Sequence, residues 1–329
     1  MKGKNMKLLA NEFILPFVEG MSCHASHFVL LRDGRVFCVF FYGSAEGNGD
    51  VRIFGSFRER DCSWSEPFAI SEDDGIAHWN PVLFERKDGA YMLFYKVGKT
   101  TSDWKTLCRV STDDCRTWSD SYEMVQGDVS GGRGPVRNKA IYLPDGSILA
   151  PGSTEVGEWK CFFDRSTDGG QTWSRSDDLC ITDELTPKYE DLAGHGIIQP
   201  TLWLSADGVH ALMRSSEGRI YRTDSTDYTH WCKPYAIDMP NNNSGIDVAR
   251  LPDGRLFLAC NPVGENWGSR TPLSLYVSHD NGLTFTFYSH LTTMRGKYAY
   301  PALRYADGCL HVTYTWNRKT LTYMCMGDI

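Results

Sequence analysis

Five arginines, three carboxylic acids and a tyrosine stand beside predicted strand ends in this sequence of 329 residues, where their side chains could act on a bound molecule. Guanidinium groups bind carboxylates through paired hydrogen bonds. Carboxyl and phenol groups transfer protons or attack electrophilic carbon. The set therefore predicts a site for an anionic ligand, with acid–base or nucleophilic chemistry. Its members are Arg133, Arg137, Arg214, Arg270, Arg318, Glu46, Asp50, Glu155 and Tyr300.

Four other polar residues, His24, His78, Lys96 and Gln199, occupy comparable positions. The two histidines could suggest a metal, but the sequence has no His-x-x-x-His and no Cys-x-x-Cys pair. Zinc sites usually need such spacings. We therefore expect these side chains to donate hydrogen bonds to sugar hydroxyls or to a carboxylate, and we predict no metal and no other cofactor.

Most of these residues also have a plain structural interpretation. Arg133 and Arg137 could belong to a solvated loop, as surface charges usually do. The segment 43–50, which carries Glu46 and Asp50, could be a turn closed by a side chain bonded to the backbone. Tyr300 could be a strand aromatic. We favour the pocket for the arginines because the Gly-rich loop before Arg137 leads directly into a strand and because charges that end buried strands need partners.

Six Asp-Gly pairs flanked by apolar runs predict the hairpins that must position these residues. In a hairpin, the start of the first strand and the end of the second lie at the same rim. The candidate residues occupy these two places in successive hairpins, so six rims that converge on one axis would form one shared pocket. The pairs begin at Asp33, Asp88, Asp145, Asp207, Asp253 and Asp307.

A second repeat has the same period. Ser166 to Trp173 reads Ser-x-Asp-x-Gly-x-Thr-Trp, in which the serine and aspartate can bond their own backbone in a tight turn. Related turns begin at Ser56, Ser111, Ser225 and Ser278, with spacings of 53–59 residues. A fixed period of this size is typical of repeat architectures. The two repeats together predict an all-β, six-bladed β-propeller that forms one domain over 1–329.

In this architecture the Ser-x-Asp turns follow the third strand of a blade, so we assign them a structural role at the rim opposite the pocket. The segment 12–17 is expected to pair with 320–325 and to close the ring, which removes two exposed strand edges.

Composition excludes several partners. A net charge of −7 argues against nucleic acid, and no apolar run is long enough to cross a membrane. The basic start lacks the apolar core of a signal peptide. Eleven cysteines without a pairing rhythm suggest reduced thiols and a cytoplasmic location. The oligomeric state stays open.

The Ser-x-Asp-x-Gly-x-Thr-Trp turn is identified as the Asp-box, or bacterial neuraminidase repeat. The chain resembles the sialidase (neuraminidase) superfamily, in its sialidase-like branch, over nearly its whole length. In sialidases three arginines clamp the sugar carboxylate, a loop aspartate is the acid/base, and a tyrosine activated by a glutamate is the nucleophile. The resemblance places Asp50 at the loop acid, Tyr300 at the nucleophile, and Arg214 and Arg270 near two clamp positions.

The sequence departs from this pattern at two places. Residues 23–26, which include His24, stand where the first-blade arginine is usual, and Gln199 stands at the activating glutamate. Glu155 could replace that glutamate if the geometry allows. The first hypothesis is an exo-acting glycoside hydrolase that removes a terminal sialic acid or related acidic sugar from a glycan. The alternatives are a polysaccharide lyase or His-dependent glycosidase acting on uronate-containing oligosaccharides, with His24, His78 and a tyrosine moving protons, and a carbohydrate-binding propeller without catalysis.

Overall fold

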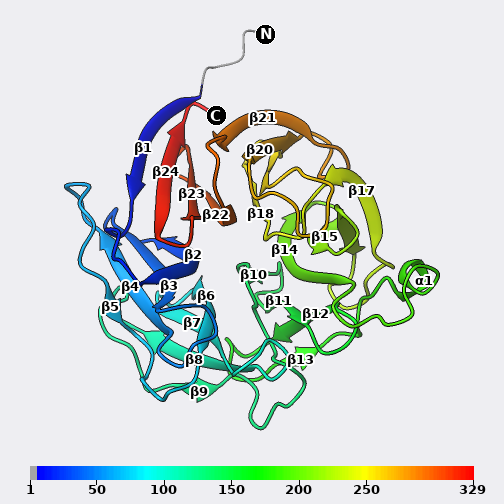
Figure 1. Cartoon of the computed structure of the whole chain (residues 1–329), viewed down its shortest axis with the longest axis horizontal. Helices are drawn as coiled ribbons and strands as arrows, with labels where there is room; N and C mark the ends of the chain where they lie inside the picture. Colours follow the sequence, from blue (N-terminus) through cyan, green and yellow to red (C-terminus); the bar gives the residue numbers. More distant parts are fainter. Residues whose placement is uncertain (1–5) are drawn as a thin grey trace.

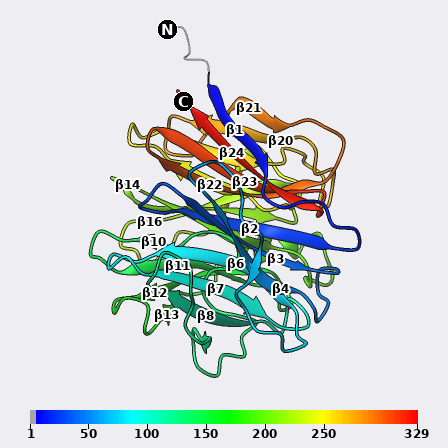
Figure 2. The same cartoon turned by 90° about the vertical axis from the view of Figure 1, so that its left-hand side faces the viewer.

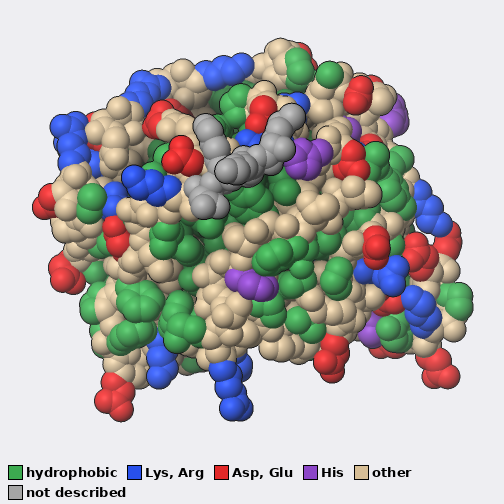
Figure 3. Space-filling model, turned by 90° about the horizontal axis from the view of Figure 1, so that it is seen from above, with side chains coloured by type: hydrophobic (Ala, Val, Ile, Leu, Met, Phe, Trp, Pro, Cys, Tyr) green, Lys and Arg blue, Asp and Glu red, His purple; other side chains and the backbone are tan. Residues whose placement is uncertain are grey.

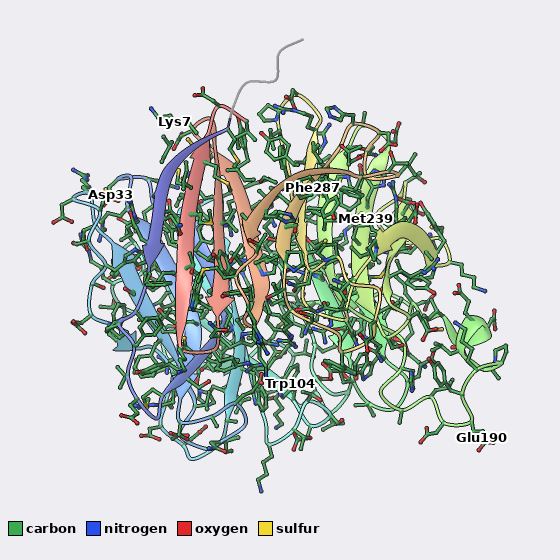
Figure 4. All side chains as sticks on the ribbon, turned by 45° about the horizontal axis from the view of Figure 1, so that its top comes forward. Lys7, Asp33, Trp104, Glu190, Met239 and Phe287 are labelled. Carbon is green, nitrogen blue, oxygen red and sulfur yellow. The ribbon has the colours of Figure 1, made fainter. Side chains whose placement is uncertain are left out.

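The computed structural model describes residues 6–329 as six four-stranded antiparallel sheets arranged in a ring (Figure 1). The first strand of each Asp-Gly hairpin lies nearest the ring centre (Figure 1). The predicted all-β, six-bladed propeller is therefore confirmed. The one helix in the described range, α1 (Thr182–Leu185), is a single turn at the periphery, close to Glu190 (Figure 4). Within residues 6–329, no helix has the length and apolar character needed to span a membrane.

Each blade takes its strands in sequence order, except that the last blade includes the first strand of the chain. Blade one comprises β2 (Ser22–Leu30), β3 (Val36–Gly43), β4 (Arg52–Arg58) and β5 (Phe68–Ala69). Blade two comprises β6 (His78–Glu85), β7 (Tyr91–Val97), β8 (Lys105–Ser111) and β9 (Tyr122–Glu123). Blade three comprises β10 (Ile141–Tyr142), β11 (Ile148–Thr154), β12 (Lys160–Ser166) and β13 (Ser174–Arg175). Blade four comprises β14 (Ile197–Ser205), β15 (Gly208–Ser215), β16 (Arg219–Ser225) and β17 (Tyr235–Pro240). Blade five comprises β18 (Asp247–Arg250), β19 (Leu256–Cys260), β20 (Leu273–Ser278) and β21 (Thr286–Thr292). Blade six comprises β22 (Tyr298–Ala306), β23 (Cys309–Trp316), β24 (Thr320–Gly327) and β1 (Lys7–Phe13).

The ring is closed by β1, which pairs antiparallel with β24, the last strand of the chain. This is the predicted kind of closure, although the strand begins five residues earlier than expected, at Lys7. Glu12 then joins β1 to blade one. Its carboxylate accepts two hydrogen bonds from the Arg58 guanidinium, at 2.6 and 2.7 Å, and one from Trp64 Nε1 at 3.0 Å. Such bidentate pairs are among the stronger polar contacts in proteins.

Both predicted repeats are found at the expected places. All six Asp-Gly pairs lie between the first and second strands of their blades. In the Asp-box of blade three, the Asp168 carboxylate accepts hydrogen bonds from the hydroxyls of Ser166 and Thr172, at 2.7 and 2.6 Å. Ser166 is the last residue of β12, so the turn lies at the end of the third strand, away from the rim where the first strand begins.

Hydrophobic side chains hold neighbouring blades together, and Figure 2 shows the sheets stacked face to face. Six buried clusters each span one of the six blade interfaces. Phe28, for example, lies between blades six and one, and Phe94 lies between blades two and three. On the flank that carries the N-terminus, acidic and basic side chains are interspersed with apolar ones (Figure 3). The ring therefore depends on its interfaces for apolar burial.

The segment before β10 fills the axis of the ring. Blade three has an inner strand of only two residues, and the preceding residues reach other blades instead. Arg137 Nη2 donates hydrogen bonds to the carbonyl oxygens of Tyr300 and Pro301 in blade six, at 2.6 and 2.8 Å. Asn138 Nδ2 donates to those of Gln199 and Pro200 in blade four, at 3.1 and 3.2 Å.

Lys139 extends this axial segment, defined as Val136–Lys139, into blade five. Its ammonium group lies 2.8 Å from both carboxylate oxygens of Asp247 and 2.8 Å from the Val248 carbonyl oxygen. Asp247 is 1 % exposed and also accepts hydrogen bonds from Thr201 Oγ1 and the Leu303 backbone nitrogen. One buried ion pair thus connects four of the six blades.

Replacing Asp247 with Asn should lower the free energy of unfolding by about 3–5 kcal/mol, because Lys139 would keep a buried charge without its partner. Chemical denaturation measures this loss. The matched control is Glu123→Gln, which breaks the ion pair of β9 with the half-exposed Lys105 and should cost at most about 1 kcal/mol. Equal losses for the two variants would contradict a central role of the Asp247 pair.

Candidate functional site

Four inner strands carry a β-bulge close to their first residues, at the rim where the candidate residues gather. The strand register shifts between residues 24 and 27, 79 and 82, 198 and 201, and 299 and 302. One bulge residue in each strand has a positive φ between 44° and 56°, which is uncommon for residues other than glycine. Bulges redirect side chains and often lie beside active sites. The four residues are Ala25, Asn80, Gln199 and Tyr300.

The Tyr300 hydroxyl is the point on which these elements converge. Its oxygen accepts hydrogen bonds from Arg214 Nη1 at 3.1 Å and from Gln199 Nε2 at 3.3 Å. Burial raises the pKa of Tyr300, but the charges of Arg214 and Arg270 and the hydrogen bond from Gln199 together lower the pKa below its usual value. Because both neighbours are donors, they stabilise the phenolate rather than the phenol.

His24 forms the floor beneath this tyrosine. The two rings stack with centroids 4.2 Å apart and an interplanar angle of 29°. His24 Nδ1 lies 2.7 Å from Thr315 Oγ1, and Nε2 has no hydrogen-bond partner among residues 6–329. Burial and four nearby arginines, Arg318 foremost, hold the pKa of His24 well below its ordinary value. His24 is therefore a neutral ring and does not supply the positive charge of an arginine.

Arg214, Arg270 and Arg318 bring positive charge to the same place. Arg214 Nε donates to Asn243 Oδ1 at 3.0 Å, and burial followed by the charges of Arg214 and Arg318 lowers the pKa of Arg270. The Arg318 carbonyl oxygen accepts a hydrogen bond from the Cys23 backbone nitrogen at 3.0 Å, so this arginine stands directly beside the inner strand of blade one. A hollow of about 490 Å³ adjoins these groups. Its lining consists of Trp267, Gly268, Ser269, Arg270, Gly296, Lys297 and Arg318.

Two of the three predicted acids face this cluster. Glu46 forms an ion pair with Arg318, and it also acts on Tyr300 and Arg270 through its charge. Burial raises the pKa of Glu155, although the charge of Arg214 opposes the shift. The two carboxyl groups therefore lie in different environments, one paired with a cation and one desolvated.

Asp50 lies outside this group because its carboxylate closes the exposed loop 44–50. It accepts hydrogen bonds from the backbone nitrogen and the hydroxyl of Ser44, both at 2.9 Å. The backbone hydrogen bond from Ser44 is the main cause of its lowered pKa. The structure thus gives Asp50 the turn-closing role that the sequence had left as an alternative.

Lys96 and Arg133 were predicted to bind substrate, but both side chains are occupied inside the protein. The Lys96 ammonium group is fully buried and donates to Thr106 Oγ1 at 2.7 Å and to the Arg133 carbonyl oxygen at 2.6 Å. The Arg133 guanidinium forms an ion pair with the buried Asp164. Their role is to hold the loop that precedes the axial segment.

The predictions for Arg137 and His78 are corrected for the same reason. Arg137 is 1 % exposed and caps the carbonyl groups of the Tyr300 bulge, with its guanidinium 5.2 Å from the centre of the Tyr300 ring. Arg137 therefore fixes the position of Tyr300 through the Tyr300 backbone. His78 Nδ1 lies 2.6 Å from Ser71 Oγ, and Nε2 lies 3.3 Å from an Asp74 oxygen, so both nitrogens have partners.

Two further residues at the same rim complete the cluster. Asn243 orients Arg214, and the exposed Trp267 places its ring 5.9 Å from the Arg214 guanidinium. The sequence signal for Asn243 was the run of three asparagines immediately before β18. The signal for the bulges was an internal proline in three inner strands, because proline cannot donate to a strand ladder. These prolines are Pro81, Pro200 and Pro301.

Comparison with known proteins places this geometry in a wider group. A model of the BNR repeat-like domain matches residues 34–312. No curated protein matches the chain in sequence. Among solved structures, a protein of unknown function from Dyadobacter fermentans is 15 % identical, with a TM-score of 0.79 and coverage of 99 % of this chain and 100 % of that one.

Two sialidase structures show the same fold. A K499G mutant of the NanB sialidase from Streptococcus pneumoniae is 12 % identical, with a TM-score of 0.71 over 96 % of this chain and 70 % of that one. The intramolecular trans-sialidase from Ruminococcus gnavus, solved with oseltamivir carboxylate, is 11 % identical, with a TM-score of 0.69 over 93 % of this chain and 94 % of that one.

The buried Lys96 should make stability rise with pH. Burial lowers the pKa of Lys96 to about 7, whereas an unfolded lysine titrates near about 10.4, so between these values the unfolded chain binds more protons. Relative to Lys96→Met, the wild-type free energy of unfolding should therefore increase by up to about 1.4 kcal/mol per pH unit above pH ~7. Urea denaturation from neutral to alkaline pH measures it, and parallel curves for the two proteins would refute the assignment.

Replacing Arg214 with Met should raise the pKa of Tyr300, because the phenolate loses its nearest positive charge. The difference in ultraviolet absorption between each protein and its Tyr300→Phe counterpart isolates this one titration. Arg165→Met is a suitable control, since Arg165 pairs with Asp145 at an outer turn. A pKa unchanged by Arg214→Met would show that the guanidinium does not stabilise the phenolate.

Proposed function

This chain belongs to the BNR repeat-like domain family of sialidase-like propellers, and on that premise we propose that it is an exo-acting glycoside hydrolase. The substrate is a glycan that ends in sialic acid or a related acidic sugar. Arg214, Arg270 and Arg318 hold the sugar carboxylate, and Tyr300 is the nucleophile. The observation that carries the proposal is the Tyr300 hydroxyl oxygen, which accepts hydrogen bonds from both Arg214 and Gln199.

The chemistry follows from this arrangement. A carboxylate nucleophile would be repelled by the carboxylate of an acidic sugar, whereas tyrosine attacks without that repulsion, and sialidases with a tyrosine nucleophile are a known exception to the two-carboxylate scheme. Electrostatic stabilisation by preorganised donors is usually the largest contribution to such catalysis. The Tyr300 oxygen would attack the anomeric carbon while the leaving oxygen departs on the opposite side.

Gln199 changes how the nucleophile is activated. A glutamate at this place could accept the phenol proton, but the Gln199 amide donates to the Tyr300 oxygen and cannot take that proton. Activation must then rest on the lowered pKa of Tyr300, with Arg214 as the main charge that lowers it. The positive charge beside Tyr300 would then take the place of a general base.

Glu155 is the acid that best suits protonation of the leaving oxygen. Desolvation raises the pKa of Glu155, so its carboxyl group keeps its proton at higher pH than an exposed glutamate. Glu46 pairs with Arg318 and would orient this arginine toward the substrate. Asp50 would keep the loop of Glu46 in shape without taking part in proton transfer.

Turnover of a fluorogenic sialic-acid glycoside tests the proposal. Tyr300→Phe should lower kcat by about 10³-fold or more, and Glu155→Gln by about 10²–10⁴-fold, which is the usual range for general acids. The matched control is Tyr305→Phe, which lies on the same strand beyond the bulge and should retain activity. No release by the wild type, or full activity of Tyr300→Phe, would overturn the proposal.

A polysaccharide lyase is the second candidate, and His24 is the observation that favours it. This neutral imidazole has an Nε2 without a partner in the described part of the chain, and it stacks on Tyr300 beside three arginines that could neutralise a uronate. A lyase would eliminate the sugar attached to O4 of a uronate and leave an unsaturated product, seen as a rise in ultraviolet absorbance with uronate-containing oligosaccharides. Glycan binding without any product would instead identify a binding propeller.

A further inference from the structure

A second hollow lies at the opposite mouth of the ring axis, where the inner strands end. Its volume is about 320 Å³, and it is formed by the ends of β2, β6, β18 and β22 together with Lys139. These strand ends lead into the Asp-Gly hairpins, so this hollow is on the face away from Tyr300. The lining residues that carry charge are Glu85, Lys139, Arg250 and Arg304.

Two of these cations have no acidic partner. Arg304 Nε donates to the Phe28 carbonyl oxygen at 2.6 Å, and Nη2 contacts the Leu83 carbonyl oxygen at 3.4 Å. Within residues 6–329, neither Arg304 nor Arg250 forms an ion pair with a carboxylate. The charges of Asp247 and Glu85 act on Arg304 from a distance, but the hydrogen bonds of this half-buried guanidinium go to carbonyl groups. A buried charge without a directly bonded counter-ion is costly away from water.

The negative groups nearby are already engaged. Asp247 lies beneath the hollow, but both of its oxygens contact Lys139, and they also accept from Thr201 and Leu303. Glu85 faces Arg32 at the rim, at 3.8 Å. Because Lys139 is paired with Asp247, the lining has two further positive groups, Arg250 and Arg304, against one negative group, Glu85. The two arginines come from the inner strands of two blades.

We propose that this mouth binds a small oxyanion of the phosphate class, free or carried by a phosphomonoester, through Arg250 and Arg304. Guanidinium groups suit such ligands because their fixed donors match two oxygens at once. Lys139 adds charge from below while it keeps its bond to Asp247. This site is separate from the Tyr300 cluster, and it does not depend on the proposed hydrolase activity.

Isothermal titration calorimetry with inorganic phosphate, at an ionic strength held constant with chloride, tests the proposal. Arg250→Ala should weaken binding about tenfold or more, as expected when a charge-assisted hydrogen bond is lost. Glu85→Gln should strengthen binding severalfold, because it removes the one negative charge of the lining. A parallel titration with glycerol phosphate distinguishes a site for free phosphate, which would exclude the ester, from one that accepts a phosphomonoester.

The control is Arg116→Ala, which removes the same charge from an exposed outer turn outside the lining and should leave the affinity within about twofold. Arg250 is exposed, so its replacement should not impair folding, whereas Arg304 also holds two carbonyl groups. The proposal is overturned if phosphate does not bind, if Arg116→Ala weakens binding as much as Arg250→Ala, or if Arg214→Met abolishes binding and so locates the anion at the other mouth.

Discussion

The buried donors of the axial segment are the constraint on which the site depends. A bulge turns Tyr300 and Gln199 toward the rim, but it also removes carbonyl groups from the strand ladder, and buried carbonyl groups need donors. Arg137 and Asn138 supply them from blade three. The inner strand of blade three is short because the residues before it, Arg137 and Asn138, bind the bulges of two other blades instead of extending the strand.

Positive charge concentrates at both mouths of the axis, although the chain as a whole carries a net charge of −7. At one mouth Arg214 and Arg270 lower the pKa of a buried tyrosine, and at the other Arg304 contacts two carbonyl oxygens. Tyr300 and Arg304 lie on the same inner strand, β22, whereas Arg214 lies at the end of the second strand of blade four. In buried surroundings a fixed charge acts more strongly than it would on the outer surface.

Local sequence motifs were enough to predict the fold. The site depends on side-chain contacts between distant residues, which the spacing of residues in the sequence does not reveal. Asp-Gly hairpins and Asp-boxes act within a few residues, so their period could be recognised from the sequence alone. Arg137 and Arg214 look alike as residues at strand ends, yet one caps carbonyl groups and the other reaches the Tyr300 hydroxyl. Lys96 and Asp50 are separated from the Tyr300 cluster by their partners, Arg133 and Ser44, and those contacts depend on how the loops fold.

The pairing of β1 with β24 also bears on how the protein is made. Lys7 lies opposite Gly327, so β1 cannot pair until β24, the last strand of the ring, has been made. Contacts of such large sequence separation form slowly, and until then the edges of blade six stay open to other chains. Blade six is consequently the part of a stalled or truncated chain that is most prone to aggregation. The ring closes only when this blade is complete.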